Sequence, residues 1–271
     1  MAGSNRAGQH RPLRLVQITD CHLGDRVGAR LLNMDTDRSL AAVLDLVRAQ
    51  QPQLDLLLAT GDLSDQGDAG AYRRFLQATR DLGAHARWLP GNHDNPSVMR
   101  SVLGSDVRLQ RNVLLGNWQV ILLDSTVPGA VGGLLAEAEL EQLCAFLRAE
   151  PTRHTLISLH HPVLPIGSAW IDPQRVANAD AFWDALQPFP QVRAVLCGHV
   201  HQRFEAQRGD VRVITSPSTC VQFAPGSADF CVDMLQPGYR WLDLHADGRI
   251  ETDVERVDGA GLEVDLTASG Y

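Results

Sequence analysis

The sequence has neither a long apolar run nor a basic segment. No stretch reaches the length of about 18 apolar residues that a membrane-spanning helix needs, and residues 1–12 have no apolar segment typical of a signal peptide. The formal net charge is -8, so we expect no nucleic-acid-binding face. These absences predict a cytoplasmic protein that has neither membrane nor nucleic acid as a partner.

The cysteine pattern excludes a disulfide framework. The chain has 5 cysteines, an odd number at irregular spacing, and it has no Cys-x-x-Cys pair. Neither paired disulfides nor a zinc knuckle is therefore expected. A reducing compartment such as the cytoplasm fits this usage, and we interpret Cys21 and Cys197 as buried thiols.

The overall composition is typical of a globular α/β protein. Hydrophobic residues make up 44% of the 271 residues and charged residues 21%, as in an ordinary globular domain. We find no internal repeat and no linker, so we predict a single domain over residues 13–257. Residues 1–12 and 258–271 are predicted to be flexible tails. The sequence leaves open whether the protein is a monomer or a homodimer.

In the first half of the chain, short apolar runs alternate with amphipathic segments. The runs 13–19, 54–59 and 86–89 predict strands, and the segments 36–50 and 69–82 predict helices. Thr36 or Asp37 would cap the first helix, and Gly83 would follow the second. This β-α-β-α-β order indicates a sheet that is at least partly parallel.

The second half has more antiparallel character. We predict strands at 113–115 and 119–124, paired around Gly116 and Asn117, and further strands at 155–159 and 192–197. Segments 136–149 and 179–186 predict helices. Between residues 202 and 257 short strands dominate, with turns at 209–210, 237–238 and 247–248.

Polar side chains with metal-binding chemistry follow several of these strands directly. The functional groups of open α/β sheets gather beyond the carboxyl ends of the strands, so five strand ends can deliver these side chains to one place. The candidate residues are Asp20, His22, Asp62, Asn92, His93, Asp94, His160, His199 and His201.

The candidate set contains enough ligands for two adjacent metal ions. Carboxylate and carbonyl oxygens suit hard cations, and imidazole suits iron, manganese, zinc and cobalt. Asp62 would bridge the two ions, because a carboxylate has two oxygens. We expect the pairs 20/22 and 199/201 to lie in extended backbone, where residues i and i+2 point the same way. The expected ligands of one metal are Asp20, His22 and His201, and those of the other are Asn92, His160 and His199.

Some residues have more than one interpretation. His160 competes with its neighbour His161 as a ligand, and we favour the first. Asp94 would either hydrogen-bond to an imidazole and fix its tautomer or cap a helix. Trp170 and Phe223 would either pack in the core or flank a planar base.

The ordered blocks D-x-H, G-D, G-N-H-D, H and G-H-x-H, between Asp20 and His201, resemble the calcineurin-like metallophosphoesterase superfamily. Other segments are similar to bacterial class III 3',5'-cyclic AMP phosphodiesterases, and the likeness spans residues 13–257. These segments are His160-His161-Pro162, Cys197 to His201, Pro217 to Phe223 and Pro237 to Leu242.

This resemblance implies a four-layer αββα sandwich with two facing mixed sheets flanked by helices. It implies two metal ions, iron or manganese, with zinc as an alternative. It also implies that a metal-bridging hydroxide hydrolyses cyclic AMP to 5'-AMP, with His93 as general acid and Asp94 supporting it. The residues expected against the phosphate are His22, Asp62, Asn92, His93 and His201.

Two other functions remain open at this point. The same centre could serve a broader phosphodiesterase that acts on glycerophosphodiesters or 2',3'-cyclic nucleotides, because the fold does not determine the substrate. A non-catalytic scaffold on the same fold would be expected to lack ligands or the acid. The complete ligand set, together with His93, argues against the scaffold.

Overall fold

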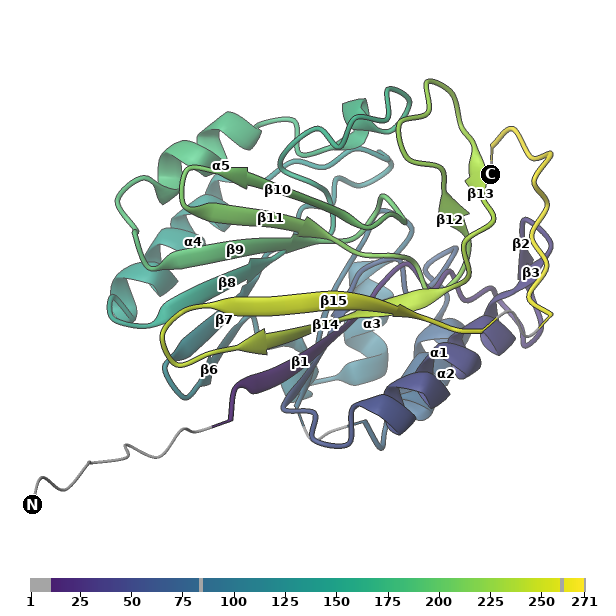
Figure 1. Cartoon of the computed structure of the whole chain (residues 1–271), viewed down its shortest axis with the longest axis horizontal. Helices are drawn as coiled ribbons and strands as arrows, with labels where there is room; N and C mark the ends of the chain where they lie inside the picture. Colours follow the sequence, from purple (N-terminus) through teal and green to yellow (C-terminus); the bar gives the residue numbers. More distant parts are fainter. Residues whose placement is uncertain (1–10, 83–84, 259–260, 271) are drawn as a thin grey trace, which may run out of the picture.

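The computed structural model describes residues 11–82, 85–258 and 261–270. Two β-sheets face each other, and helices cover the outer face of each (Figure 1). The four-layer αββα sandwich predicted from the sequence is confirmed. Residues 1–10 of the predicted tail lie outside the described residues, and so does Gly83, which was predicted to follow the second helix.

The first sheet has five strands in the order β15-β14-β1-β4-β5. Strands β1, β4 and β5 are parallel to one another, as the β-α-β-α-β pattern predicted, and β14 pairs antiparallel with both β1 and β15. Their bounds are β1 Leu13–Ile18, β4 Leu56–Thr60, β5 Ala86–Leu89, β14 Gly238–Leu244 and β15 Ile250–Arg256.

The second sheet has six strands in the order β10-β11-β9-β8-β7-β6. The predicted hairpin around Gly116 and Asn117 joins β6 to β7, and β7, β8, β9 and β11 run parallel. The bounds are β6 Asn112–Leu115, β7 Trp118–Leu122, β8 His154–Ser158, β9 Val192–Cys197, β10 Phe204–Arg208 and β11 Val211–Thr215.

Most of the α-helices follow a polar N-cap residue, although the helix that begins at Glu137 follows Ala136. Asp35 caps the first helix by accepting a hydrogen bond from Arg38 N. The cap is thus one residue before Thr36 and two before Asp37, the two predicted caps. The second helix ends at Ala78, four residues before the predicted Leu82. The helices are α1 Thr36–Gln50, α2 Ala69–Ala78, α3 Pro96–Leu103, α4 Glu137–Ala149 and α5 Ala179–Leu186, with 3-10 turns η1 Val107–Leu109 and η2 Asp172–Gln174.

Two small antiparallel pairs complete the fold. They are β2 Arg30–Leu31 with β3 Met34–Asp35, and β12 Gln222–Phe223 with β13 Val232–Asp233. Turns at 209–210 and 247–248 join β10 to β11 and β14 to β15, as predicted. The predicted turn at 237–238 is wrong, because Gly238 begins β14 and pairs with Arg256.

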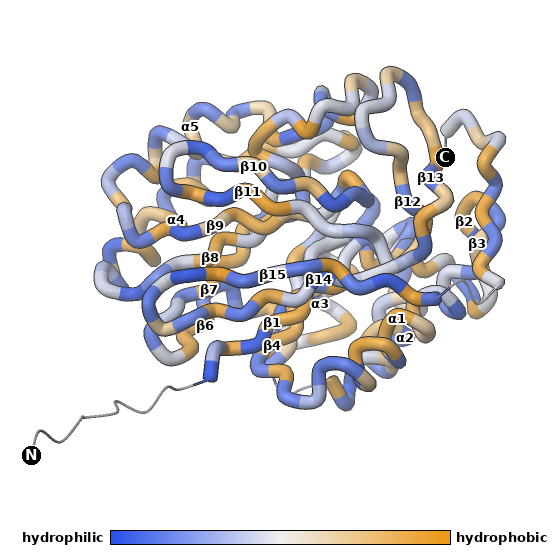
Figure 2. The backbone as a smooth tube through the Cα atoms, viewed as in Figure 1, coloured by the Kyte–Doolittle hydropathy of each residue, from blue (hydrophilic) through white to orange (hydrophobic). Residues whose placement is uncertain are grey.

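The core consists of three apolar layers, which follow from the alternation of side chains along the strands. Leu15, Leu56 and Leu156 lie between the sheets, whereas Val16 and Ile157 face the helices. Figure 2 shows hydrophobic stretches along the inner strands and along α1 and α2, while β15 is largely hydrophilic. Each sheet is therefore buried on both faces where it packs in the sandwich.

A buried arginine joins the two sheets. Arg240 of β14 is 0% exposed; its Nε donates to the carbonyl of Thr215 in β11 at 3.2 Å, and its Nη1 donates to Glu205 in β10 at 3.0 Å. Hydrogen bonds to a charged group are stronger than neutral ones. This contact fixes the distance between the sheets beside the strand ends that carry the candidate ligands.

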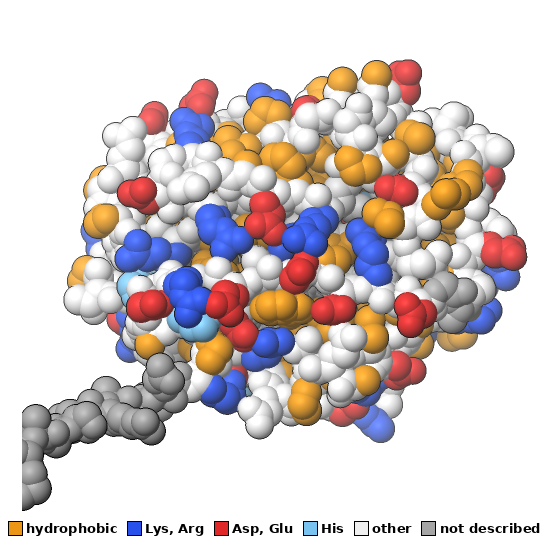
Figure 3. All heavy atoms as spheres, viewed as in Figure 1, with side chains coloured by type: hydrophobic (Ala, Val, Ile, Leu, Met, Phe, Trp, Pro, Cys, Tyr) orange, Lys and Arg blue, Asp and Glu red, His pale blue; other side chains and the backbone are white. Residues whose placement is uncertain are grey.

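The face of the molecule on which β14 and β15 lie carries charges of both signs. The chain has no lysine, so its cationic side chains are arginines. Figure 3 shows basic and acidic groups intermingled on the face that β14 and β15 form, and Arg203 pairs there with Asp253 at 2.6 Å. Such mixing gives this face no extended positive potential.

No helix in the described residues is long and apolar enough to cross a membrane.

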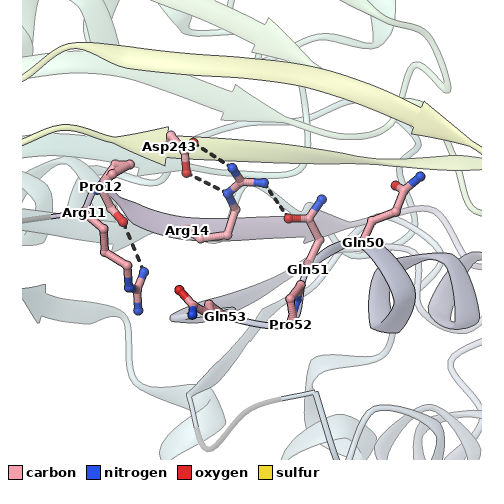
Figure 4. Close-up of a pocket in the computed structure, with 8 residues that line it drawn as sticks. All are labelled: Arg11, Pro12, Arg14, Gln50, Gln51, Pro52, Gln53 and Asp243. Atoms are coloured by element: carbon pink, nitrogen blue, oxygen red, sulfur yellow. Dashed lines mark hydrogen bonds and ion pairs between the residues drawn. The ribbon is translucent and has the colours of Figure 1, made fainter.

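A polar hollow lies at the amino-terminal end of β1, opposite the strand ends that carry the candidate ligands (Figure 4). Arg14 lines this hollow, and its guanidinium pairs with Asp243 at 2.6 Å and with Gln51. Arg11 pairs with Asp55 at 2.6 Å. Both positive charges are neutralised, so this hollow offers no free cation to an anionic ligand.

The C-terminal residues 261–270 run along the domain beside β2 and β3 (Figure 1). Leu262 is buried in the core next to α1, and Asp265 N donates to the carbonyl of Leu32 at 2.8 Å. Gly270 reaches the cleft described below.

Candidate metal centre

The carboxyl ends of strands from both sheets converge on one cluster of buried acids and imidazoles. β1 and β4 end before Asp20 and Asp62, while β8 and β9 end before His160 and His199. Metal-binding atoms within 4.8 Å of one another form four overlapping groups: Asp20 with His22 and His201; His160 with His161 and His199; Asp20 with Asp62 and His160; and His22 with Asp62 and His93.

The first half of the centre brings Asp20, His22 and His201 together, as predicted. His201 Nε2 lies 3.4 Å from Asp20 Oδ1 and 3.3 Å from His22 Nε2. All three side chains are buried. Two imidazole nitrogens and one carboxylate oxygen thus lie close together. This donor set suits a transition-metal ion.

The second half of the centre is built around His160. Its Nε2 lies 3.2 Å from Asn92 Oδ1 and 3.2 Å from Asp62 Oδ2. The His199 ring lies 5.2 Å from that of His160, centre to centre. His160 therefore lies next to Asn92 and near His199, the two residues expected to bind the same ion.

Asp62 lies between the two halves. Its Oδ2 is 3.2 Å from His160 Nε2 and 3.8 Å from His22 Nε2, and its Oδ1 accepts a hydrogen bond from His93 N at 2.9 Å. One carboxylate therefore touches imidazoles of both groups. This is the position that a bridging ligand requires.

Hydrogen bonds fix the tautomers of the imidazoles. His160 Nδ1 lies 2.9 Å from the carbonyl of Thr60, and His201 Nδ1 lies 2.8 Å from the carbonyl of Val221. A carbonyl only accepts, so Nδ1 carries a proton in each ring, and the lone pair of the neutral ring is on Nε2. Nε2 is the atom that faces the centre, which is the arrangement found around metal-binding histidines.

The backbone of the paired ligands differs from the prediction. Asp20, His22, His199 and His201 have φ angles of 55°, 45°, 70° and 48°, in the left-handed region rather than the extended one. The expectation of β alternation at these pairs is therefore wrong, although the members of each pair do meet in the cluster. Asp62 also has a positive φ, of 50°. Such backbone costs on the order of 1–3 kcal/mol per residue and concentrates at functional sites.

Two glycines allow the loops of the centre to approach closely. A Cβ on Gly91 would lie 2.2 Å from Asp62 Oδ1, and one on Gly61 would lie 2.4 Å from His160 Nδ1. Gly61 also has a φ of 96°, which favours glycine. The glycines in the G-D and G-N-H-D blocks are thus required by the contact between the loops.

The centre is strongly polar although it is buried. Burial would raise the pKa of Asp20 and Asp62, but the charges of His201 and His160 hold both pKa values below their usual range. Burial would lower the pKa of His160, but Asp62 and Asp20 together raise it to about 9. Buried anions need positive partners, so this cluster favours a cation, supplied by protons or by metal ions.

The interpretation of Asp94 as a helix cap is wrong, because its carboxylate binds the backbone of two loops. Its carboxylate accepts from the backbone N–H of Gly91 at 2.9 Å and of Ser64 at 3.0 Å, and from the Tyr72 hydroxyl at 3.0 Å. The cap of α3 is Asn95 rather than Asp94. Asp94 therefore ties the loop after β4 to the loop after β5. Burial and the charge of Asp62 raise its pKa to about 6.

His161 is held by structural contacts on both ring nitrogens. Nε2 donates to the carbonyl of Val131 at 3.0 Å, and Nδ1 accepts from Ser125 Oγ at 2.8 Å. Neither nitrogen keeps a free lone pair for a metal, which favours His160 as the ligand. Burial lowers the pKa of His161 to about 3, so the ring is neutral.

His93 lies at the edge of the centre, with its side chain 22% exposed. Its Nδ1 donates to the carbonyl of Asp65 at 3.0 Å, and its ring is 4.7 Å from the His22 ring, centre to centre. Because the carbonyl retains the proton on Nδ1, Nε2 is the nitrogen that can gain or lose one. His93 thus has the contacts of a proton-transfer group.

Sequence reasoning missed three residues that support the centre. Asp65 accepts from His22 Nδ1 at 3.3 Å, Gln174 Oε1 lies 3.1 Å from His199 Nε2, and Tyr72 binds Asp94. Asp65 stands three residues after Asp62, which is the one sequence signal that could have identified it. Gln174 and Tyr72 have no such signal, because their contacts are long-range.

A cleft of about 300 Å³ opens beside the centre. Its lining includes the polar side chains of Asn92, His93 and His199 and the aromatic rings of Trp170 and Phe230. The Trp170 indole is held by a hydrogen bond from Nε1 to Ser227 Oγ at 3.1 Å and by edge contact with the Phe230 ring, 5.1 Å away. The cleft thus combines polar and aromatic side chains in its lining.

Phe223, the other aromatic residue considered from the sequence, is buried. Its ring stacks on that of His201, with centres 4.2 Å apart and planes 7° apart. Phe223 therefore supports a candidate ligand from behind as well as lining the cleft.

Comparison with known proteins agrees with this geometry. A model of the calcineurin-like phosphoesterase family matches residues 13–203. The chain is 49% identical to 3',5'-cyclic adenosine monophosphate phosphodiesterase CpdA of Pseudomonas aeruginosa, over 99% of this chain and 98% of that protein. It is 40% identical to the protein of the same name from Escherichia coli K12, over 98% and 97%.

Solved structures share the fold at low sequence identity. A dimetal phosphatase from Danio rerio superposes with a TM-score of 0.63 at 17% identity, covering 92% of this chain and 100% of that one. A purple acid phosphatase from yellow lupin superposes with a TM-score of 0.67 at 12% identity, covering 95% and 53%. The family match and the full-length relatives establish that this chain belongs to the calcineurin-like phosphoesterase family.

Proposed function

We propose that this protein hydrolyses 3',5'-cyclic AMP to 5'-AMP at the centre between the two sheets. The observation that carries the proposal is the identity of 38% to 49% with proteins named 3',5'-cyclic AMP phosphodiesterase, each over at least 96% of this chain. The complete cluster of acids and imidazoles supports it. Residues 13–257 would act as one domain in the cytoplasm.

The donor set fits two metal ions. Asp20, His22 and His201 would hold one ion and Asn92, His160 and His199 the other, with Asp62 shared between them. Two deeply buried carboxylates, and ring nitrogens whose lone pairs face inward, support this assignment. Bound divalent ions supply Lewis acidity and lower the pKa of coordinated water. Iron or manganese, and alternatively zinc, suits this mixture of oxygen and nitrogen donors.

His93 would transfer the proton to the departing 3'-oxygen. The carbonyl of Asp65 holds the proton on Nδ1, so a protonated ring presents Nε2–H to the cleft. The backbone N–H of His93 at the same time fixes Asp62 Oδ1. The side chains that would contact the phosphate are His22, Asp62, Asn92, His93 and His201.

The aromatic side chains of the cleft would receive the adenine. Trp170 is partly exposed and held in place by Ser227, so it offers a fixed ring to a base. Stacking of a base on an aromatic side chain is worth about 1–3 kcal/mol. His93 and Asn92 line the same cleft, so the phosphate would lie beside them.

The first prediction concerns the substrate. After reconstitution with iron, manganese or zinc in turn, the protein should release 5'-AMP from cyclic AMP with at least one metal. Its kcat/KM for 3',5'-cyclic AMP should exceed that for 2',3'-cyclic AMP and for glycerophosphodiesters. Absence of 5'-AMP at every metal loading, or a higher kcat/KM for a glycerophosphodiester, would contradict the proposal.

The second prediction concerns His93. His93→Ala should lower kcat for cyclic AMP by about 10²- to 10⁴-fold, the usual contribution of a general acid, because the 3'-oxygen is a poor leaving group. Hydrolysis of a diester with a nitrophenolate leaving group should fall far less, and the number of bound metal ions should not change. The exposed His85 gives a matched control, since His85→Ala should leave both rates unaltered. An equal loss with both substrates would remove the acid role.

The third prediction concerns Trp170. Trp170→Ala should raise KM for cyclic AMP by about 5- to 140-fold, which corresponds to the loss of about 1–3 kcal/mol of stacking. Trp170→Phe, which keeps an aromatic ring, should recover most of the affinity. Steady-state kinetics with a diester that has no base should show little change in either variant. A similar rise in KM for both substrates would mean that Trp170 supports the loop rather than the base.

A further inference from the structure

Gln174 lies at the contact between the centre and the wall of the cleft. It is the last residue of η2, and its Oε1 is 3.1 Å from Nε2 of His199. The side chain lines the cleft together with Trp170 and Ile171. No motif of the sequence includes Gln174, so its role follows from this geometry alone.

The orientation of the Gln174 amide follows from its two partners. Its Nε2 donates to the carbonyl of Trp170 at 3.4 Å, and that carbonyl can only accept. The amide oxygen must therefore point toward His199. Two backbone bonds hold the residue in place: its N–H donates to Ile171 O at 2.9 Å, and its carbonyl accepts from Gly133 N at 3.2 Å. The acceptor is thus fixed before any ligand binds.

This acceptor determines which nitrogen of His199 keeps a free lone pair. Because Gln174 Oε1 only accepts, His199 Nε2 carries the proton and Nδ1 keeps its lone pair. The rings of His160 and His201 are oriented by backbone carbonyls instead, which no substitution removes. The tautomer of His199 therefore depends on a replaceable side chain.

We propose that Gln174 is a positioning residue that selects Nδ1 of His199 as the metal-facing nitrogen and so holds the ion of the Asn92, His160 and His199 group. This inference rests on the metal centre of the proposed function, and it assigns a role to a residue outside the predicted ligand set. Partners that orient a ligating histidine typically contribute 10- to 100-fold to metal affinity. Gln174 binds His199 and not a ligand of the other ion, so affinity for the ion of the Asp20, His22 and His201 group should be unaffected.

The test is metal binding by Gln174→Met and Gln174→Glu. Methionine keeps the length of the side chain but removes the amide acceptor, whereas glutamate keeps an acceptor oxygen. In a manganese titration against a competing chelator, Gln174→Met should bind one ion per chain with the affinity of the unsubstituted protein and the second about 10- to 100-fold more weakly. Gln174→Glu should bind both. The exposed Gln187 gives a control, since Gln187→Met should bind both ions normally.

The melting temperature of the metal-free Gln174→Met protein should match that of the metal-free original. Two ions bound with undiminished affinity by Gln174→Met would overturn the inference, and so would loss of the second ion in Gln174→Glu as well. Equal weakening of both ions, or a lowered melting temperature, would show a general structural role and would also overturn it. Failure to hydrolyse cyclic AMP by the unsubstituted, two-metal protein would instead reject the proposed substrate and leave this inference standing.

Discussion

The burial of two carboxylates, those of Asp20 and Asp62, is the constraint on which the centre depends. Both are at most 2% exposed between the ends of the two sheets. A buried anion without a positive partner costs far more than a folded protein can sustain. The centre has the features of a cation-binding site. Imidazoles surround the carboxylates, and five residues of the centre have left-handed backbone.

The sandwich supplies this place because its two sheets end together. β1 and β4 contribute Asp20 and Asp62 from one sheet, and β8 and β9 contribute His160 and His199 from the other. Polar contacts join the sheets beside the centre: Gln17 Nε2 donates to the carbonyl of Cys197 at 3.1 Å, and Arg240 reaches Glu205. The apolar layers stabilise the sandwich, while these contacts set the spacing at the strand ends.

Much of this arrangement could be predicted from sequence, because the information is local. The ligands directly follow apolar strands, so the cluster can be inferred from the strand ends and their parallel order. What could not be predicted depends on contacts across the chain. Asp94 binds the loop of Ser64 and the hydroxyl of Tyr72, and Gln174 reaches His199, although no pattern joins these residues. The left-handed backbone of Asp20 and His199 could not be predicted either, because the apolar strands before them suggested that the extended conformation continues.

The most direct test of the account is the anomalous scattering of crystals grown with manganese. We predict two peaks in the centre, both in contact with the Asp62 carboxylate, one beside Asp20, His22 and His201 and the other beside Asn92, His160 and His199. A single peak under saturating manganese, or two peaks of which one does not touch Asp62, would contradict the claim that this buried carboxylate joins two ions.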